Sequence, residues 1–493
     1  MLFNSFPFIA VFLPVSLLVY FWLNRLRLVL AADSWLLAAS VFFYGWWDIR
    51  YVPLLLGSIL FNYTIGSLLT VQEGKQPKFS RSVVFLTGIS VNLLVLGYFK
   101  YADFFLGSIN AVSGSSLPLL KLVLPLGISF FTITQIAFLV DSYEGLAEER
   151  NLLHYGLFVT FFPHLLAGPI LHHKDMMPQF GQLRNKVLNY RNLSTGLFLF
   201  MLGMFKKVVI ADTVGPLANE GFLNSATITL IDAWVASLAY TTQLYFDFSG
   251  YSDMALGVAW MFNIRLPANF NSPYKATSII DFWKRWHMTL TNFITTYVYT
   301  PIVRSFSRVT FSVSLAAIFL SMLVSGFWHG AGWTYVLWGG LHGFTLVLNH
   351  WWRKKKIKMP QAVGWLLTFG FVNFSMVLFR AKDMGEAWRM LWAMSGCNGV
   401  ILPISWQKLV PALADYGVTW GKMFGAINGH GDVAVVFVAL AVAFFFKFNS
   451  LRYAEPTQFQ PSRLNQVLLI GMILINLLFL NSIRAKEFLY FGF

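Results

Sequence analysis

Long apolar segments separated by short polar stretches run through most of this chain. The first, from Phe8 to Leu23, contains no charge, and the bases Arg25 and Arg27 come directly after it. A secretory signal would carry its bases before a shorter apolar core. Since basic residues are retained on the cytoplasmic side of a membrane, we expect a retained first membrane helix whose N-terminus faces outward.

Similar apolar segments recur to the end of the chain. They lie near residues 34–47, 51–70, 83–99, 122–140, 153–171, 193–211, 229–248, 286–303, 310–328, 331–350, 362–379, 432–447 and 464–482. A spanning helix needs roughly 20 residues, and several of these segments are too short or too broken to cross alone. The pattern predicts an all-α polytopic membrane protein with about 11 transmembrane helices, plus re-entrant and interfacial helices around a central tunnel.

Helix-breaking sequences interrupt three of the segments, at Pro125-Leu126-Gly127, at Pro163 to Pro169 and at Ser249-Gly250-Tyr251. Broken backbone at membrane depth must be buried in protein or line a wet cavity. We expect residues 1–493 to form one membrane domain. Its longest extramembrane loop is 381–430, which contains a predicted interfacial helix from Met384 to Met394.

Composition supports a chain that is dissolved in lipid. Hydrophobic residues make up 57% of the 493 and charged residues 12%, about half the charged share of soluble domains. The single cysteine, Cys397, excludes an intramolecular disulfide and a multi-cysteine metal centre. The net charge of +15 is spread over short runs such as Lys206-Lys207 and Lys284-Arg285. These runs are typical of cytoplasmic loops, so we expect membrane lipid and no nucleic acid as a partner.

Two aspartates lie in an apolar segment, Asp247 and Asp253. Six residues apart, they point to different faces of an unbroken helix, whereas a break at Gly250 would let both face one cavity. The alternative is that one carboxylate caps a helix restarting at Ser252 and the other pairs with a nearby base. We favour the structural role.

Residues 278–287 predict a short amphipathic helix. Ser278 is a plausible N-cap, and Asp281 and Arg285 are then partners at i and i+4. Trp283 and Trp286 suit a helix that lies at the cytoplasmic interface.

Histidines follow in the most apolar surroundings. His287 lies at the inner end of that short helix, and both a structural and a catalytic role stay open for it. His329 lies between two long apolar segments, where a polar side chain is costly unless it has partners or a task. An imidazole can accept or release a proton near neutral pH, and Gly330 allows close approach of a substrate. We favour acid–base chemistry for His329 and hydrogen bonding between helices for His342.

Three other histidines, His164, His172 and His173, invite comparison with metal sites. The breaks at Pro163 and Pro169 and the absence of an acidic partner before Asp175 argue against a preformed site. We therefore predict no metal and no bound cofactor.

Taken together, the motifs resemble the membrane-bound O-acyltransferase family, and most closely its bacterial branch typified by alginate O-acetyltransferase. The matching stretches are Leu2 to Ser5, Phe43 to Trp47, Leu96 to Tyr101, Leu124 to Phe130, Phe162 to Pro169, Tyr245 to Ala255, Asp281 to His287, Phe327 to Ala331, Phe379 to Ala381 and Phe488 to Phe493.

The resemblance implies a multi-pass enzyme of the bacterial cytoplasmic (inner) membrane. It would move an acetyl group from cytoplasmic acetyl-CoA, as donor substrate, toward an exopolysaccharide acceptor such as alginate or cellulose, with an extracytoplasmic acetyltransferase as partner. The family's essential histidine falls on His329, and its second active-site histidine falls on His287. Further candidates for lining the substrate tunnel are Trp328, Asp247, Asp253, Trp283 and Arg285.

The expected mechanism is acyl transfer through a tunnel. The thioester would enter near Lys284-Arg285, whose charges could hold coenzyme A phosphates. His329 would act as general base, worth roughly 10²–10⁴-fold, and His287 would orient the acceptor or stabilise an oxyanion. Low-dielectric surroundings favour the neutral imidazole that a base requires.

Alternatives stay open, partly because polysaccharide-modifying relatives carry an Arg-Asp pair and a Gly-Gly-Asn-Arg turn where this chain has Thr295 to Arg304. One alternative is a D-alanyl transferase that acts on a wall polymer. A second is a transporter or flippase for a lipid-linked sugar, which would use the cavity without chemistry. A third, less favoured, is a lipid or sterol acyltransferase.

Overall fold

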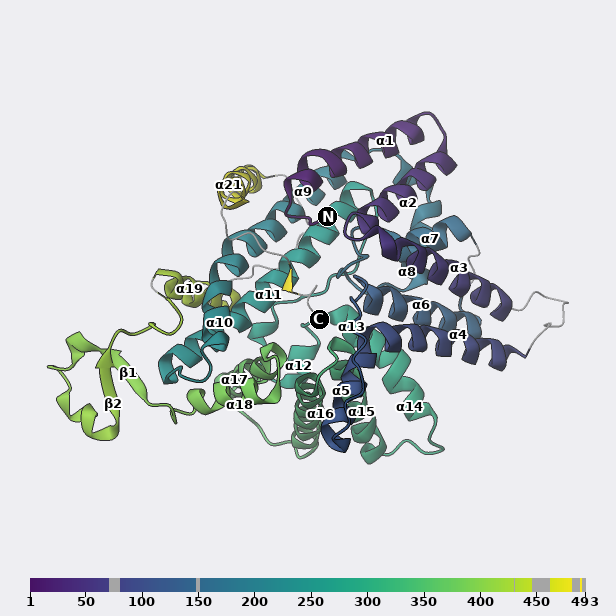
Figure 1. Ribbon diagram of the computed structural model, residues 1–493. Helices are drawn as coiled ribbons and strands as arrows, with labels where there is room; N and C mark the ends of the chain where they lie inside the picture. The colour runs from purple at the N-terminus through teal and green to yellow at the C-terminus, as the bar shows by residue number, and fades with distance from the viewer. Residues whose placement is uncertain (71–79, 148–150, 430, 446–461, 481–487, 490–493) are drawn as a thin grey trace.

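The computed structural model describes residues 1–70, 80–147, 151–429, 431–445, 462–480 and 488–489. Within these ranges almost all regular structure is helical, and the helices pack around the long central helix α11 (Figure 1). The strands β1 (Val400–Pro403) and β2 (Val418–Gly421) pair in parallel and project from the helical body. The all-α class predicted from the sequence is confirmed.

Along the chain, a first series of helices precedes the central helix α11, and a second series consists of α11 and the helices that follow it. The first series is α1 (Leu13–Arg25), α2 (Val29–Gly45), α3 (Val52–Leu69), α4 (Arg81–Leu96), α5 (Ala102–Ser113), α6 (Ile128–Tyr143), α7 (Leu152–Thr160), α8 (His173–Gly181), α9 (Tyr190–Met204) and α10 (Asp212–Leu223). The second is α11 (Leu230–Met261), α12 (Ile279–Trp283), α13 (Met288–Ile294), α14 (Thr300–Arg304), α15 (Phe311–His329), α16 (Trp333–Lys354), α17 (Gln361–Arg380), α18 (Met384–Met394), α19 (Gly431–Phe445) and α21 (Arg463–Leu480).

Shorter turns of other helical types join or extend these helices. The π-helical turns are η1 (Pro7–Phe12), η3 (Gly97–Tyr101), η5 (Phe205–Ala211) and η7 (Thr295–Tyr299). The 3₁₀ turns are η2 (Ile49–Tyr51), η4 (Leu183–Lys186), η6 (Pro273–Lys275), η8 (Ile404–Trp406) and η9 (Pro411–Tyr416).

Side-chain caps fix where several helices begin. Asn189 accepts hydrogen bonds from two backbone N–H groups at the start of α9, and Thr310 accepts one at the start of α15. Ser278 caps α12 as predicted, with its hydroxyl accepting from the backbone N–H of Asp281. Asp383 caps α18, whose bounds equal the predicted interfacial helix. Since such caps satisfy N–H groups that a helix leaves unpaired, these boundaries follow from local sequence.

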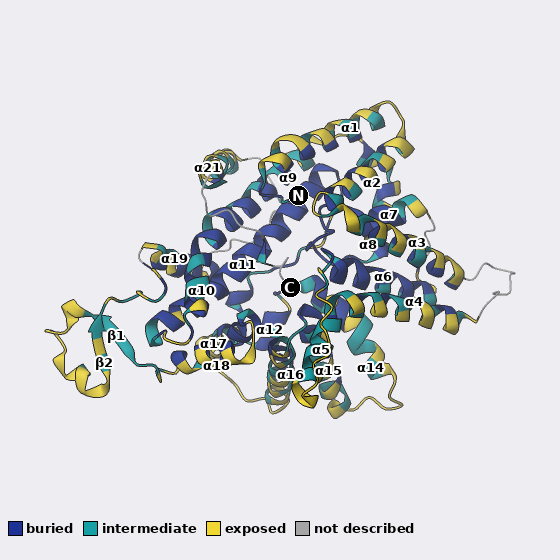
Figure 2. Cartoon of the chain, viewed as in Figure 1, coloured by how far each residue is buried: buried dark blue, intermediate teal, exposed yellow. Residues whose placement is uncertain are grey.

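The distribution of burial is that of a membrane protein. α11 is buried along nearly its whole length, whereas the outer faces of α1, α3 and α4 are exposed (Figure 2). Those outer faces are apolar: Leu18 of α1 and Leu94 of α4, for example, are each 71% exposed. Large exposed apolar surface is unfavourable in water but is the surface that lipid requires. The protein is therefore membrane-embedded and crosses the bilayer several times.

Seven helical segments within the described residues are long and apolar enough to span a bilayer, and three shorter apolar helices accompany them. The seven are Pro7–Arg25, Ile49–Leu69, Arg81–Ser113, Tyr190–Leu223, Phe311–His329, Gln361–Arg380 and Arg463–Leu480. The shorter helices are Val29–Gly45, Ile128–Tyr143 and Gly431–Phe445. The polytopic architecture is confirmed, and the count of about eleven spanning helices stays a prediction.

The predicted backbone breaks have different outcomes. Residues 161–171 are non-helical and buried, as expected for broken backbone at membrane depth. α11, in contrast, passes through Gly250 without a break, so that expectation is wrong. A β-carbon at Gly250 would lie 2.7 Å from the carbonyl oxygen of Gly203. The glycine thus allows α11 to pack closely against α9.

Candidate active site

A tight helical hairpin carries His329. α15 ends at His329, the extended residues Gly330 to Gly332 turn the chain, and α16 begins at Trp333. A β-carbon at Gly326 would lie 2.8 Å from the Cα of Gly339, so only glycine allows the two backbones to approach this closely. Glycines thus pack the two helices of the hairpin closely, and His329 lies at its closed end.

Aromatic rings enclose the His329 imidazole, which belongs to a residue that is 5% exposed. Its ring centroid lies 4.9 Å from that of Trp328, 5.3 Å from that of Trp338 and 5.2 Å from that of Phe379. The centroid of the fully buried His287 lies 6.4 Å away. The fold therefore brings together the two histidines singled out in the sequence, although 42 positions separate them (329 − 287).

A strained backbone position holds His287. Its φ of 44° and ψ of 53° are left-handed values, which cost a non-glycine residue about 1–2 kcal/mol. Asn269 supports this conformation: its Oδ1 lies 3.0 Å from His287 Nδ1 and accepts from the backbone N–H of Thr289 at 3.2 Å. Its carbonyl oxygen accepts from the backbone N–H of Met288 at 2.9 Å. Strain that neighbours hold in place is common at functional sites.

The same contacts determine the tautomer of neutral His287. A backbone N–H can only donate, so the Asn269 Oδ1 that receives the Thr289 bond is an acceptor. His287 Nδ1 must then carry the proton and donate it to this oxygen. The lone pair of the ring is consequently on Nε2. Sequence inspection did not single out Asn269, because the 18 positions that separate it from His287 give no local signal.

His342 has a different environment. Its Nδ1 accepts from Trp283 Nε1 at 3.3 Å, so its Nε2 carries the proton and donates to Ser375 Oγ at 3.0 Å. The Ser375 hydroxyl donates in turn to the Val372 carbonyl oxygen. Both ring nitrogens thus join helices, which agrees with the structural role favoured for this residue.

Two cavities approach His329 from different directions. The first, which we call the His329 cavity, has a volume of about 150 Å³ and is lined by Lys100, Gly127, Leu166, Trp328 and His329, among others. Trp328 Nε1 is a buried donor without a hydrogen-bond partner among the described residues. A buried donor of this kind gains a partner when a ligand with an acceptor oxygen enters.

The second cavity, which we call the basic cavity, has a volume of about 390 Å³. Its walls include Trp283, Lys284, Ser325, His350 and Arg353. Ser325 lies one helical turn before His329 on α15, so this cavity ends close to the histidine. Lys284 and Arg353 are exposed and lend positive charge to the other end.

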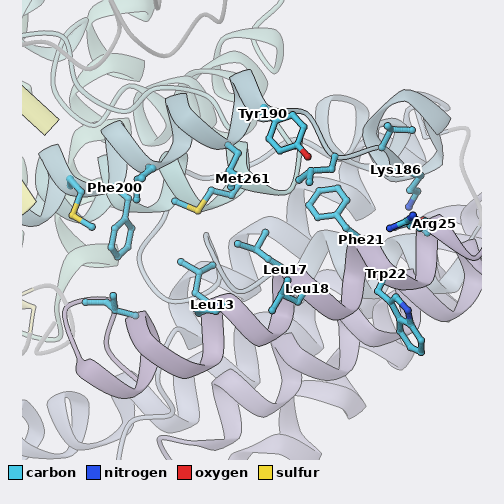
Figure 3. A pocket seen from close by; sticks show the side chains of 18 residues that line it. Leu13, Leu17, Leu18, Phe21, Trp22, Arg25, Lys186, Tyr190, Phe200 and Met261 are labelled. Atoms are coloured by element: carbon cyan, nitrogen blue, oxygen red, sulfur yellow. The ribbon is translucent and has the colours of Figure 1, made fainter. Parts of the chain in front are cut away.

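A larger cavity lies elsewhere. A groove of about 860 Å³ runs between α1 and α9, with Leu13, Leu17 and Phe21 along one wall and Arg25 at one end (Figure 3). No histidine or carboxylate is among its lining residues. The groove is mostly apolar and neither His287 nor His329 lines it, so it is not the candidate active site.

Asp247 and Asp253 lie away from both cavities. Lys207 Nζ is 2.6 Å from Asp247 Oδ1 and 2.9 Å from Asp212 Oδ1, and Lys206 Nζ is 2.6 Å from Asp253 Oδ2. These five side chains are buried, and we call them the ion-pair cluster. The expectation that Lys206-Lys207 lies in a cytoplasmic loop is therefore wrong. Because an unpaired charge at this depth is very costly, the pairing supports the structural reading of both aspartates.

The candidates Trp283 and Arg285 also differ in whether they line a cavity. Trp283 lines the basic cavity, whereas Arg285 is not among its lining residues. Arg285 Nε donates to Asp281 Oδ1 at 2.9 Å, which is the predicted i,i+4 pair. The exposed Lys284 contributes the charge to the cavity. Trp283 and Trp286 are only 6% and 5% exposed, so their rings pack inside the protein, and the placement of this helix at the cytoplasmic interface stays a prediction.

Two of the three histidines considered as metal ligands, His172 and His173, contact polar side chains. His172 Nδ1 lies 3.0 Å from the Tyr297 hydroxyl, which donates to Asp141 Oδ2 at 2.9 Å. His173 Nδ1 lies 3.1 Å from the same oxygen. In the part of the chain that the structure describes, no group of three or more potential metal-ligating side chains comes together.

The comparison with known families is decisive. The model of the membrane-bound O-acyltransferase family matches residues 7–382 of the chain. The chain belongs to the membrane-bound O-acyltransferase family. The enzyme is accordingly an O-acyltransferase.

Several curated relatives are similar over much of the acyltransferase. This chain is 45% identical over 432 residues to the peptidoglycan O-acetyltransferase of Helicobacter pylori, and the match covers 82% of this chain and 81% of the relative. It is 37% identical over 518 residues to the probable alginate O-acetylase of Pseudomonas putida, covering all of both chains. The teichoic acid D-alanyltransferase of Bacillus subtilis is 30% identical over 275 residues, 52% of this chain and 69% of the relative.

Proposed function

We propose that this acyltransferase moves an acetyl group from cytoplasmic acetyl-CoA across the bacterial cytoplasmic membrane toward a glycan on its outer side. The observation that carries the proposal is the place of His329. It lines one cavity, faces His287, and lies one helical turn from the end of a second, basic cavity.

The direction of transfer follows from the charges along α16. This helix ends in Arg353 and Lys354, and further bases continue to Lys358. Under the positive-inside rule this end is cytoplasmic, so the basic cavity opens to the cytoplasm. His329 lies at the other end of the hairpin, about 30 Å away at 1.5 Å per residue. The His329 cavity is then the outer, acceptor-side chamber.

The basic cavity suits a coenzyme A thioester. Lys284 and Arg353 offer positive charge at the mouth for phosphate groups, and the inner wall is mostly apolar for the rest of the donor. The acetyl end would reach toward Ser325 and His329. No residue of this cavity needs to react covalently for the donor to be held there.

The chemistry needs one base and one donor. His329 takes the proton of the acceptor hydroxyl while its oxygen attacks the thioester carbonyl carbon, and the carbon–sulfur bond then breaks. The proton passes to the departing thiolate, so coenzyme A leaves as the thiol. The Trp328 indole N–H is a candidate to stabilise the carbonyl oxygen as it gains charge. His287, with its lone pair on Nε2, would orient the acceptor hydroxyl.

The names of the relatives support a glycan as acceptor, because peptidoglycan and alginate are both polymers with sugar hydroxyl groups. An extracytoplasmic acetyltransferase partner would complete transfer to the polymer. D-Alanyl transfer is the second candidate, since the teichoic acid D-alanyltransferase shares about half of this chain.

The test uses membranes that contain the wild-type protein or His329→Ala, together with acetyl-CoA labelled in the acetyl group. Candidate acceptors are peptidoglycan, alginate and cellulose, each with and without a secreted acetyltransferase. Label that enters one polymer only with wild type supports the proposal and identifies the acceptor. His154→Gln, which changes a histidine remote from both cavities, is the matched control.

Three results would each overturn part of the proposal. Label that enters a polymer equally with His329→Ala would remove His329 from the mechanism. Reaction with a D-alanyl carrier protein and none with acetyl-CoA would favour the wall-polymer activity. Translocation of a lipid-linked sugar without any acyl donor would instead favour a transporter.

A further inference from the structure

One sequence motif of the chain has no part in the function proposed above. The stretch from Leu96 to Tyr101 contains a lysine within a 33-residue apolar helical segment, Arg81–Ser113. A base at such depth is expensive and usually marks a functional position. The lysine, Lys100, lies on the π-helical turn η3, a kind of turn that is rare and frequent at functional sites.

The side chains of η3 contact the last turn of the helix that carries His329. Lys100 Nζ donates to the carbonyl oxygen of Trp328 at 2.7 Å and to that of His329 at 3.2 Å. The hydroxyl of Tyr101 donates to the carbonyl oxygen of Phe327 at 2.8 Å. Neighbouring residues of one π-helical turn thus bind three consecutive carbonyl groups of α15.

Those three carbonyl groups are among the four that every α-helix leaves without an internal partner at its C-terminus. In a protein buried in lipid, each must find a donor from another part of the chain. The positive ammonium is also favourable beside the negative end of the helix dipole. The third proton of Lys100 goes to Ser129 Oγ at 3.0 Å. No carboxylate among the described residues forms an ion pair with Lys100, so α15 and α6 are its principal partners.

We propose that Lys100 and Tyr101 are positioning residues, which hold the last turn of α15 so that the His329 imidazole faces His287 and the His329 cavity. We call this pair the η3 clamp. Its catalytic consequence rests on the proposed acyl transfer, whereas its effect on the end of α15 does not. Neither side chain reacts with substrate.

The geometry indicates why such a clamp is needed. His329 is the last residue of its helix, where helices fray and carbonyl groups have no partner within the helix. The stacked rings of Tyr101 and Phe327, with centroids 4.2 Å apart, add a second contact to the same turn. A displacement of the imidazole by about 1 Å can cost 10²-fold in rate, so the last turn must be held accurately.

The first test separates rate from binding in purified protein. We expect Lys100→Met to lower kcat by about 10²-fold, with KM for acetyl-CoA changed by less than about a factor of two, because the basic cavity is untouched. Tyr101→Phe removes one neutral hydrogen bond and should lower kcat about fivefold. Lys100→Arg should recover part of the loss, since a guanidinium can donate to both carbonyl groups and the adjacent 150 Å³ cavity offers room.

The matched control is Tyr155→Phe, which removes another buried phenol hydrogen bond, from Tyr155 to Gln135 Oε1 at 3.2 Å. It should leave kcat unchanged. A loss of folded protein with unchanged kcat per folded molecule in Lys100→Met or Tyr101→Phe would overturn the proposal. If Lys100→Met does not fold, Tyr101→Phe and Lys100→Arg decide by the same criterion. A raised KM at constant kcat would also overturn it.

The second test does not depend on activity. Hydrogen exchange measured on peptides that cover residues 320–335 should be faster in Lys100→Met and Tyr101→Phe than in wild type or Tyr155→Phe, because the last turn of α15 opens more often. Unchanged exchange in both clamp variants would overturn the clamp. Faster exchange in a protein that transfers no acetyl group would support the clamp and count against the proposed function alone.

Discussion

The ion-pair cluster and the histidine pair are both polar, buried and enclosed by helices, yet they are built in different ways. In the ion-pair cluster, ammonium groups meet carboxylates at 2.6 to 2.9 Å, away from both cavities. In the histidine pair, His287 contacts the amide oxygen of Asn269, and His329 lines a cavity. Aromatic rings surround it.

The difference teaches how to separate structure from chemistry at membrane depth. A buried charge must be neutralised by a partner, and once paired it has little capacity left to move a proton. A neutral imidazole is less costly to bury and keeps a lone pair for a substrate proton. The sign of function is therefore a titratable group beside a cavity, rather than a titratable group that is merely buried.

The strongest test of this comparison is His329→Ala. We expect transfer to fall by about 10²–10⁴-fold, the usual contribution of a general base, while the amount of folded protein in the membrane stays the same. Labelled acetyl transfer and detergent-solubilised yield measure the two quantities. Residual transfer near the wild-type rate would contradict the contrast between the two regions.

The converse test is Asp253→Asn in the ion-pair cluster. Breaking this pair leaves Lys206 as an unpaired buried charge, so we expect the protein to lose about 3–5 kcal/mol of stability. Thermal unfolding in detergent measures the loss. The molecules that stay folded should transfer at the wild-type rate, and a rate defect in them would give Asp253 a catalytic role.

A double variant sharpens that result. Lys206→Met combined with Asp253→Leu removes both charges and keeps apolar volume, so it should be more stable than Asp253→Asn alone. The thermal midpoint of both proteins, compared under one detergent condition, is the measurement. A double variant as unstable as the single one would show that the pair does more than neutralise its own charges.

The support of His287 gives a smaller effect. Asn269→Leu removes the acceptor that fixes the proton on Nδ1, and we expect kcat to fall about tenfold, the value of one hydrogen bond near 1.4 kcal/mol. The measurement is kcat with saturating acetyl-CoA. If only KM for the donor changes, His287 acts in the basic cavity instead.

The exposed charges of the basic cavity should have the smallest effect on transfer. Replacing Lys284 and Arg353 by Gln should raise KM for acetyl-CoA by several-fold, because phosphate contacts in water are worth about 1 kcal/mol each. KM for an uncharged acetyl thioester that lacks the nucleotide should not change. Equal effects on both donors would mean that the basic cavity does not bind phosphates.

Local sequence predicted many of the elements. The apolar run before Arg25, the Ser278 cap and the Asp281–Arg285 pair each depend on residues within a few positions of one another. The predicted helix from Met384 to Met394 has the same bounds in the structure. The structure contains these predicted features because hydrogen bonds within a helix and caps at its ends need no distant partner.

Other expectations failed where a distant helix decided the outcome. Gly250 of α11 packs against α9 and does not break its helix, because the backbone around Gly203 fills the space beside it. Lys206 and Lys207 read as loop bases, yet aspartates of α11 more than 35 residues away neutralise them. No local pattern reveals a partner of that kind.

By itself, the sequence determined the class of the protein and the identity of its two candidate catalytic histidines. Apolar length and aromatic content select a lipid environment, and the motif residues fix the family. Only the tertiary structure decided that His287 adopts a left-handed conformation, that Asn269 orients it and that Lys100 binds the end of α15. The physical reason is distance along the chain: propensity acts within a few residues, whereas these contacts join segments that meet only when the helices pack.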